Sequence, residues 1–192
     1  MNKSSIKKLL LFLLSIIIFM MFYETKYDLL EKKIYHNDSL LVKYEGFKKQ
    51  KLEQEISLSS ELISSFIDSA YTFLGTPNKI GGIDRKSIDA SGLISISLKK
   101  NGISKFPRIA QEMATYGKII IDINNLRRGD LVFFFNTYPS KRLISSTGIY
   151  LGNNEFITSS SKLGVSIQKL DNPNFKYNYW KEHFFYGTRI FN

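Results

Sequence analysis

The chain has 192 residues, and its 27 Lys and Arg outnumber its 17 Asp and Glu, which gives a formal net charge of +10. It contains no cysteine, so disulfides and thiol redox chemistry are excluded. Such a basic chain could bind nucleic acid, but no basic cluster with interleaved aromatic residues stands out. We therefore expect no nucleic-acid partner.

The N-terminus resembles an export signal. Lys3, Lys7 and Lys8 precede the apolar run Leu9–Phe22, the charged and apolar parts of such a signal. No small-x-small cleavage site follows, so we expect residues 1–23 to be an uncleaved signal anchor, with a cleaved signal peptide as the alternative. Residues 6–23 would then contact the bacterial inner membrane in a single pass. The positive charges would keep the N-terminus in the cytoplasm and place the globular part in the periplasm or another extracytoplasmic space.

Residues 24–58 form a polar segment after this run. They are dense in Lys, Glu and Gln, and their apolar residues recur at irregular helical spacings. A short polar helix and a solvated tether both fit this pattern, and we favour the tether. The segment is predicted to act as a spacer.

Residues 59–192 have the length of one domain with its own core. Apolar residues recur with helical period from Leu62 to Leu74, and Gly75 with Pro77 ends that helix. A second helix is predicted over Ala90–Asn101, with Asp89 near its cap, and a third over Ile109–Tyr116. Short β-branched and aromatic runs then predict strands at 119–122, 131–135, 147–151, 155–159, 165–170 and 184–190. Helices followed by a strand meander predict an α+β domain.

Asp89-Ala90-Ser91-Gly92-Leu93 is the most informative motif, and it lies at the predicted start of the second helix. Further motifs appear in order along the chain: Phe73-Leu74-Gly75-Thr76-Pro77, Pro107-Arg108, Gly129-Asp130-Leu131-Val132-Phe133-Phe134, Ser145-Ser146-Thr147-Gly148-Ile149-Tyr150 and Phe156-Ile157-Thr158. Together they resemble the NlpC-type peptidase family, bacterial cysteine endopeptidases that cut peptidoglycan stem peptides. The resemblance covers roughly residues 59–192 and implies a papain-like fold.

The same resemblance implies a cysteine nucleophile at the helix N-terminus, a histidine base and a second group, commonly histidine, that orients it. These positions hold Ala90, Ser146 and Thr158, and the only histidines, His36 and His183, lie elsewhere. A neighbouring serine without a base is a poor nucleophile. We therefore predict that the chain is not an enzyme, and we expect neither a cofactor nor a metal.

Three functions fit this pattern. The first is an inactive homologue that serves as a scaffold or partner-binding domain of an envelope assembly. The second is a peptidoglycan-binding module whose cleft retains Asp89, Ser91 and Arg108, with Asn78 where the family usually has tyrosine. The third is a wall hydrolase that uses non-standard residues. The expected partner is peptidoglycan or an envelope protein, and the positive charge suits an anionic wall.

Overall fold

The computed structural model describes residues 3–171 and 178–192, which fall into two compact units, Met1–Leu41 and Val42–Asn192. The first unit contains the long helix α1, Lys3–Lys32, whose apolar residues up to Met21 are exposed. The apolar run stops at Phe22, short of the roughly 20 residues that a bilayer requires, and α1 continues through charged residues such as Asp28 and Glu31. In the described part of the chain, no helix combines the length and apolarity needed to cross a membrane. The predicted single-pass membrane location is therefore wrong.

The helix α2, Asp38–Lys48, begins in the first unit and continues into the second. Its residues Tyr44 and Phe47 are fully buried, and their rings meet the Phe185 ring with centroids 6.1 and 6.3 Å apart. The chain after α2 also pairs with the domain through single bridges, Gln54 with Tyr116 and Leu58 with Phe191. The domain boundary after residue 58 stays a prediction, but the structural unit begins at Val42.

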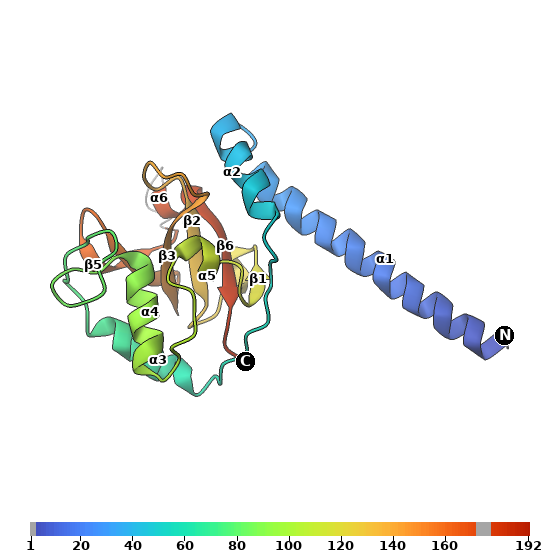
Figure 1. Cartoon of the computed structure of the whole chain (residues 1–192), viewed down its shortest axis with the longest axis horizontal. Helices are drawn as coiled ribbons and strands as arrows, with labels where there is room; N and C mark the ends of the chain where they lie inside the picture. Colours follow the sequence, from blue (N-terminus) through green and yellow to red (C-terminus); the bar gives the residue numbers. More distant parts are fainter. Residues whose placement is uncertain (1–2, 172–177) are drawn as a thin grey trace. The chain divides into compact units, whose positions relative to one another are not determined.

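Three more helices lie between α2 and the first strand. They are α3 (Leu62–Tyr71), α4 (Ala90–Lys100) and α5 (Ala110–Met113). The third is shorter than the sequence predicts because the backbone beyond it bonds elsewhere: the Gln54 N–H donates to the Thr115 carbonyl, and the Gly117 N–H donates to the Gln54 carbonyl. α4 lies against β3 and β4, and α5 lies against β3 (Figure 1).

Within the described residues, six strands form one antiparallel sheet in the order β1-β6-β2-β3-β4-β5. The strands are β1 (Lys118–Ile120), β2 (Leu131–Phe135), β3 (Ile144–Gly152), β4 (Glu155–Ser160), β5 (Gly164–Lys169) and β6 (Phe184–Arg189). A tight turn joins β3 to β4, where Asn153 and Asn154 adopt positive φ angles of 51° and 64°. Asparagine tolerates this left-handed conformation, so the predicted hairpin forms there. The α+β fold class is confirmed.

Both faces of the sheet are covered at its centre, because every residue of β2 is buried. On one face, Val132 and Phe134 of β2 belong to a cluster with Tyr150, Phe156 and Phe184. The short helix α6, Tyr179–His183, closes this cluster: the Trp180 ring lies 4.8 Å from the Phe134 ring between centroids. This packing fixes the strand ends and α6 around the cavity described next.

Candidate functional site

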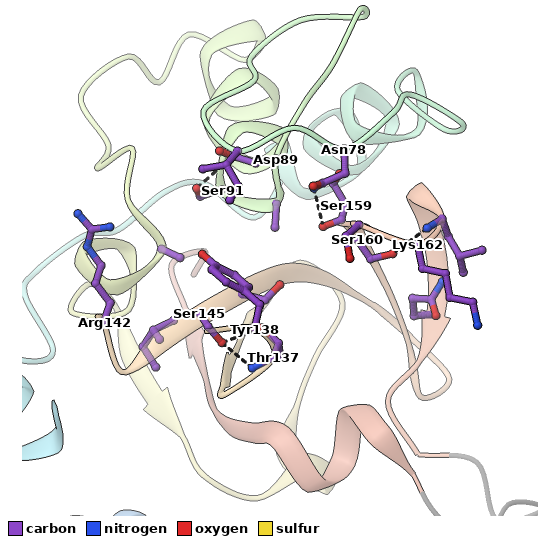
Figure 2. Close-up of a pocket in the computed structure, with 18 of the residues that line it drawn as sticks. Asn78, Asp89, Ser91, Thr137, Tyr138, Arg142, Ser145, Ser159, Ser160 and Lys162 are labelled. Atoms are coloured by element: carbon purple, nitrogen blue, oxygen red, sulfur yellow. Dashed lines mark hydrogen bonds between the residues drawn. The ribbon is translucent and has the colours of Figure 1, made fainter. Parts of the chain in front are cut away.

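A cavity of about 1000 Å³ opens at the N-terminal end of α4. Figure 2 shows Asp89 and Ser91 on the α4 side and Tyr138 and Ser145 across from them. The remaining walls come from the loop before α4, the β4–β5 turn and α6. The lining mixes apolar side chains such as Ile109, Ile144 and Leu163 with hydroxyl-bearing and aromatic ones, which include Thr137, Tyr138, Ser145, Ser146, Ser159, Ser160, Ser161, Tyr179 and Trp180.

Asp89 fixes the start of α4. It has an extended backbone at the cap position, and its Oδ1 accepts a hydrogen bond of 2.6 Å from the Gly92 N–H. This is the cap that an aspartate before a helix predicts. Its Oδ2 accepts a second bond of 2.6 Å from the Gly81 N–H, which ties the preceding loop to the helix. Asp89 therefore holds two segments of the cavity wall together.

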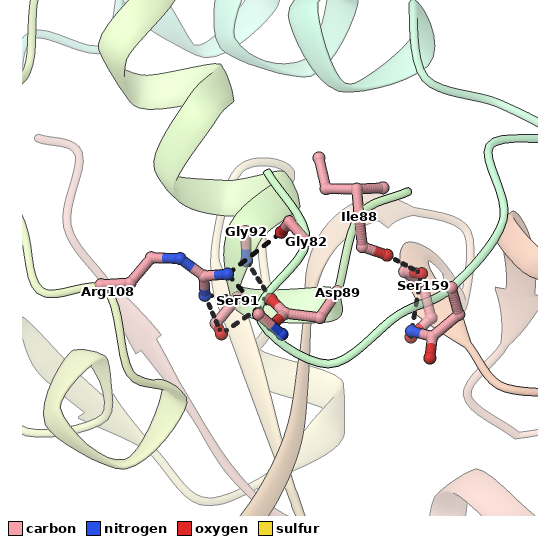
Figure 3. A network of polar contacts seen from close by, with 9 residues as sticks. Gly82, Ile88, Asp89, Ser91, Gly92, Arg108 and Ser159 are labelled. Carbon is pink, nitrogen blue, oxygen red and sulfur yellow. Dashed lines mark hydrogen bonds and ion pairs between the residues drawn. The ribbon is translucent and has the colours of Figure 1, made fainter. Parts of the chain in front are cut away.

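Arg108 completes a polar network behind the helix end (Figure 3). Its Nη1 lies 2.9 Å from Asp89 Oδ1 and donates to Ser91 Oγ over 2.7 Å. Its Nη2 donates to Asp89 Oδ2 and to the Gly82 carbonyl, each over 3.0 Å. Ser91 Oγ in turn donates to Asp89 Oδ1 over 3.2 Å. The guanidinium thus offsets the carboxylate charge and fixes the Ser91 hydroxyl.

Asn78 connects the loop to the sheet. Its Nδ2 donates to Ser159 Oγ over 2.9 Å, and Ser159 Oγ donates to the Ile88 carbonyl over 2.7 Å. Asn78, Asp89, Ser91 and Arg108, the four cleft residues named from the sequence, all line the cavity. Their role in binding a ligand stays a prediction.

Of the three positions that depart from the family pattern, two line the cavity and one does not. Ala90 is the first residue of α4 and lines the cavity, and so does Ser146 on β3. Thr158 on β4 is fully buried and is not a lining residue, since its hydroxyl donates to the Thr147 carbonyl over 2.6 Å. His183 ends α6, and its ring stacks on Tyr179 with centroids 4.4 Å apart, also outside the lining set.

Several lining residues were not identified from the sequence. Arg142 and Lys162 are exposed and mark the two ends of the cavity in Figure 2, and Thr137 and Tyr138 lie in the loop after β2. No motif marks these loop positions, although the paired serines at 145–146 and 159–160 are visible as hydroxyl-rich strand ends. Among the residues that the structure describes, no group of three His, Asp or Glu side chains could hold a metal ion.

Comparison with known proteins identifies the domain. The profile of the NlpC/P60 family matches residues 75–185. The chain belongs to the NlpC/P60 family. It is 33% identical over 135 residues to the probable endopeptidase NlpC of Escherichia coli K12, a match that covers 70% of this chain and 82% of that protein. It is 28% identical over 141 residues to the murein DD-endopeptidase/murein LD-carboxypeptidase MepS of the same strain, covering 73% of this chain and 68% of MepS.

Solved structures agree with this assignment. An NLP/P60-family protein from Staphylococcus aureus superposes with a TM-score of 0.58 at 28% identity, over 75% of this chain and 45% of that one. The chain thus spans less than half of the solved relative. The resemblance to the NlpC-type family and its papain-like fold is confirmed, and the chain contains an NlpC/P60 peptidoglycan hydrolase-like domain.

The prediction that the chain is not an enzyme is contradicted by these relatives, which are named as endopeptidases. That prediction counted Thr158 as part of the reacting site, yet Thr158 is fully buried in β4, with its hydroxyl bonded to the Thr147 carbonyl of β3, and it does not line the cavity. It also held that Ser91 has no adjacent base, whereas the Ser91 hydroxyl donates to the Asp89 carboxylate and accepts from Arg108. The residue types at three positions therefore did not suffice to exclude a reaction.

Proposed function

We propose that this NlpC/P60 domain binds peptidoglycan stem peptides in the cavity at the N-terminus of α4. The observation that carries the proposal is the open cavity itself, about 1000 Å³ in volume, in a domain whose relative MepS is named a murein endopeptidase. That volume is in the range of small-ligand sites. A short peptide can enter a cavity of this volume, whereas a protein partner with a flat surface cannot.

The chemistry of the walls also suits a peptide. Each serine or threonine hydroxyl both donates and accepts a hydrogen bond, so lining hydroxyls such as those of Ser146 and Ser161 can pair with either the N–H or the C=O of a ligand backbone. Tyr138 and Trp180 add apolar faces with a polar atom at the edge. The lining thus offers both polar and apolar contacts to a peptide.

Hydrolysis of the bound peptide is the second candidate function, because the relatives are named endopeptidases and the cavity holds a fixed hydroxyl. Ser91 Oγ donates to Asp89 Oδ1 and accepts from Arg108. In this reaction Ser91 Oγ would attack the peptide carbonyl carbon while Asp89 takes its proton and returns it to the leaving amine. Water would then release the acyl group from Ser91.

A scaffold function in an envelope assembly would leave the cavity without a role. A filled cleft would favour that function, but the bulky Ile80 at the cavity edge is 78% exposed and does not pack into the space. We therefore place peptide binding ahead of the scaffold function. An envelope protein as the main partner becomes an outcome of the test below.

The test is to incubate the full chain with purified peptidoglycan, then to measure the co-sedimented protein and the muropeptides released. Ala90→Leu fills the helix end of the cavity and should abolish the co-sedimentation that remains at about 1 M salt, where charge attraction is screened, while Lys99→Leu places the same side chain on the exposed surface of α4 and should not. Equal retention of the wild type and Ala90→Leu at that salt concentration would overturn the proposal in favour of another surface. Muropeptide release that Ser91→Ala abolishes would establish hydrolysis.

A further inference from the structure

The first turn of α4 presents backbone donors that are not used within the domain. The cap carboxylate of Asp89 takes the Gly92 N–H. In the described residues, the N–H groups of Ala90 and Ser91 donate to no acceptor, and both residues line the cavity. α4 is eleven residues long, so its N-terminal end also carries the partial positive charge of a helix.

Ser146 provides a second, independent observation at the same place. Its residue is 8% exposed, it lines the cavity from β3, and β3 lies against α4. Its hydroxyl has no hydrogen-bond partner anywhere in residues 3–171 and 178–192. Three other hydroxyls without a partner, those of Ser95, Ser97 and Thr188, are fully enclosed. The Ser146 oxygen is not enclosed in this way and opens to the cavity.

The charges around the cavity favour an anion. The lining contains three cationic side chains, those of Arg108, Arg142 and Lys162, and a single carboxylate, that of Asp89. Both oxygens of Asp89 are already occupied, Oδ1 by the Gly92 N–H and Oδ2 by the Gly81 N–H, and Arg108 contacts both. Ala90 adds only a methyl group beside the free donors, so no side-chain acceptor competes for them.

We propose that these groups form a carboxylate-binding site. A ligand carboxylate accepts hydrogen bonds from the N–H groups of Ala90 and Ser91 and from the Ser146 hydroxyl, with Arg142 and Lys162 steering it into the cavity. This inference rests on the proposed function, and it names the group by which a stem peptide is held. The carboxylate can come from the C-terminus of the peptide or from its glutamate residue.

The test is calorimetric titration of the full chain with the stem tetrapeptide L-alanyl-γ-D-glutamyl-L-lysyl-D-alanine. The two comparison peptides carry an amide at the C-terminus or at the free glutamate carboxyl. We expect one amide to weaken binding about tenfold or more, the size of a hydrogen bond to a charged group, and the other to bind nearly unchanged. The weakened peptide identifies the source of the carboxylate.

Two variants assign the effect to these donors. Ser146→Ala removes the hydroxyl and should weaken binding of the unmodified peptide, without further weakening that of the amide that already binds poorly. Ser95→Ala removes a partnerless hydroxyl of α4 that does not line the cavity, and it should change neither affinity. Ala90→Pro removes one N–H at the first helical position, where proline is tolerated, and the extended backbone of Asp89 suits a residue before proline. Circular dichroism checks that α4 remains folded.

The outcomes separate this inference from the proposed function. If the acid and both amides bind equally well, or if Ser146→Ala and Ala90→Pro leave the preference intact, the carboxylate site is refuted while peptide binding stands. If none of the three peptides binds, both proposals are overturned.

Discussion

Gly92 shows how closely the loop before α4 approaches the helix. A Cβ at this position would lie 2.4 Å from the Gly82 carbonyl oxygen, a backbone atom that cannot rotate away. We predict that Gly92→Ala lowers the free energy of unfolding by about 1–3 kcal/mol, since overpacking forces backbone shifts. Urea denaturation measures this. Gly46→Ala in α2 is the control, because a Cβ there meets nothing within 4 Å and alanine favours a helix by up to about 1 kcal/mol.

The Asp89 carboxylate has a second role that a neutral cap cannot fill. Asp89→Asn keeps an adequate helix cap. However, the asparagine NH₂ group replaces Oδ2, the oxygen that accepts from the Gly81 N–H and from Arg108 Nη2, so donors would meet donors. We expect a loss of about 1–2 kcal/mol in the free energy of unfolding, because these donors lose an acceptor. Asp171→Asn breaks only the more exposed pair with Lys181 and should cost less than about 1 kcal/mol. Similar urea midpoints for the two variants would contradict the assignment.

The sequence could identify Asp89, Ser91 and Arg108 because they lie within or beside family motifs at the start of a helix. It could not identify Arg142 or Lys162, which lie in loops whose path depends on the strands they join. Thr158 marks a different limit. Its strand was predicted, but whether its side chain faces the cavity or the interior depends on the register of β4 with β3, which pairs Ile149 with Ile157. Adjacent strand residues point to opposite faces, so a pattern match alone does not assign the face.

Among the elements, α2 is the one whose role the sequence missed. Its apolar residues have irregular spacing, so the segment resembled a polar tether. Tyr44 and Phe47 pack on Phe185, far away in the chain, and only the folded sheet brings these rings together. The strands were easier to predict, because runs such as Leu131–Phe135 are apolar throughout and are buried on both faces.

Removing this packing gives a prediction for the domain. A fragment of residues 59–192 lacks Tyr44 and Phe47, and we expect it to be less stable than residues 42–192 by about 3–5 kcal/mol or more, the cost of losing a buried aromatic side chain. In the full chain, Tyr44→Ala should lower the free energy of unfolding, while Tyr35→Ala, at a tyrosine 66% exposed, should not. If the two fragments unfold at the same urea concentration, α2 is a tether after all.

At the scale of the whole molecule, charge and cavity would make separate contributions to the proposed binding of peptidoglycan. The net charge of +10 would attract an anionic wall at long range, and salt would screen this attraction. The Debye length falls from about 10 Å at 0.1 M salt to about 3 Å at 1 M. Contacts inside the cavity act at hydrogen-bond distance and exclude part of the solvent, so salt should weaken them less.

Co-sedimentation with peptidoglycan across a salt series separates these two contributions. We expect binding of the wild type to fall as salt rises and then to level off at a salt-resistant fraction, because the cavity contacts remain. Ala90→Leu should follow the same initial fall, since its charge is unchanged, but should continue to zero. A wild type that also falls to zero near 1 M salt would mean that charge alone retains the protein on the wall, and the cavity would then need a different ligand.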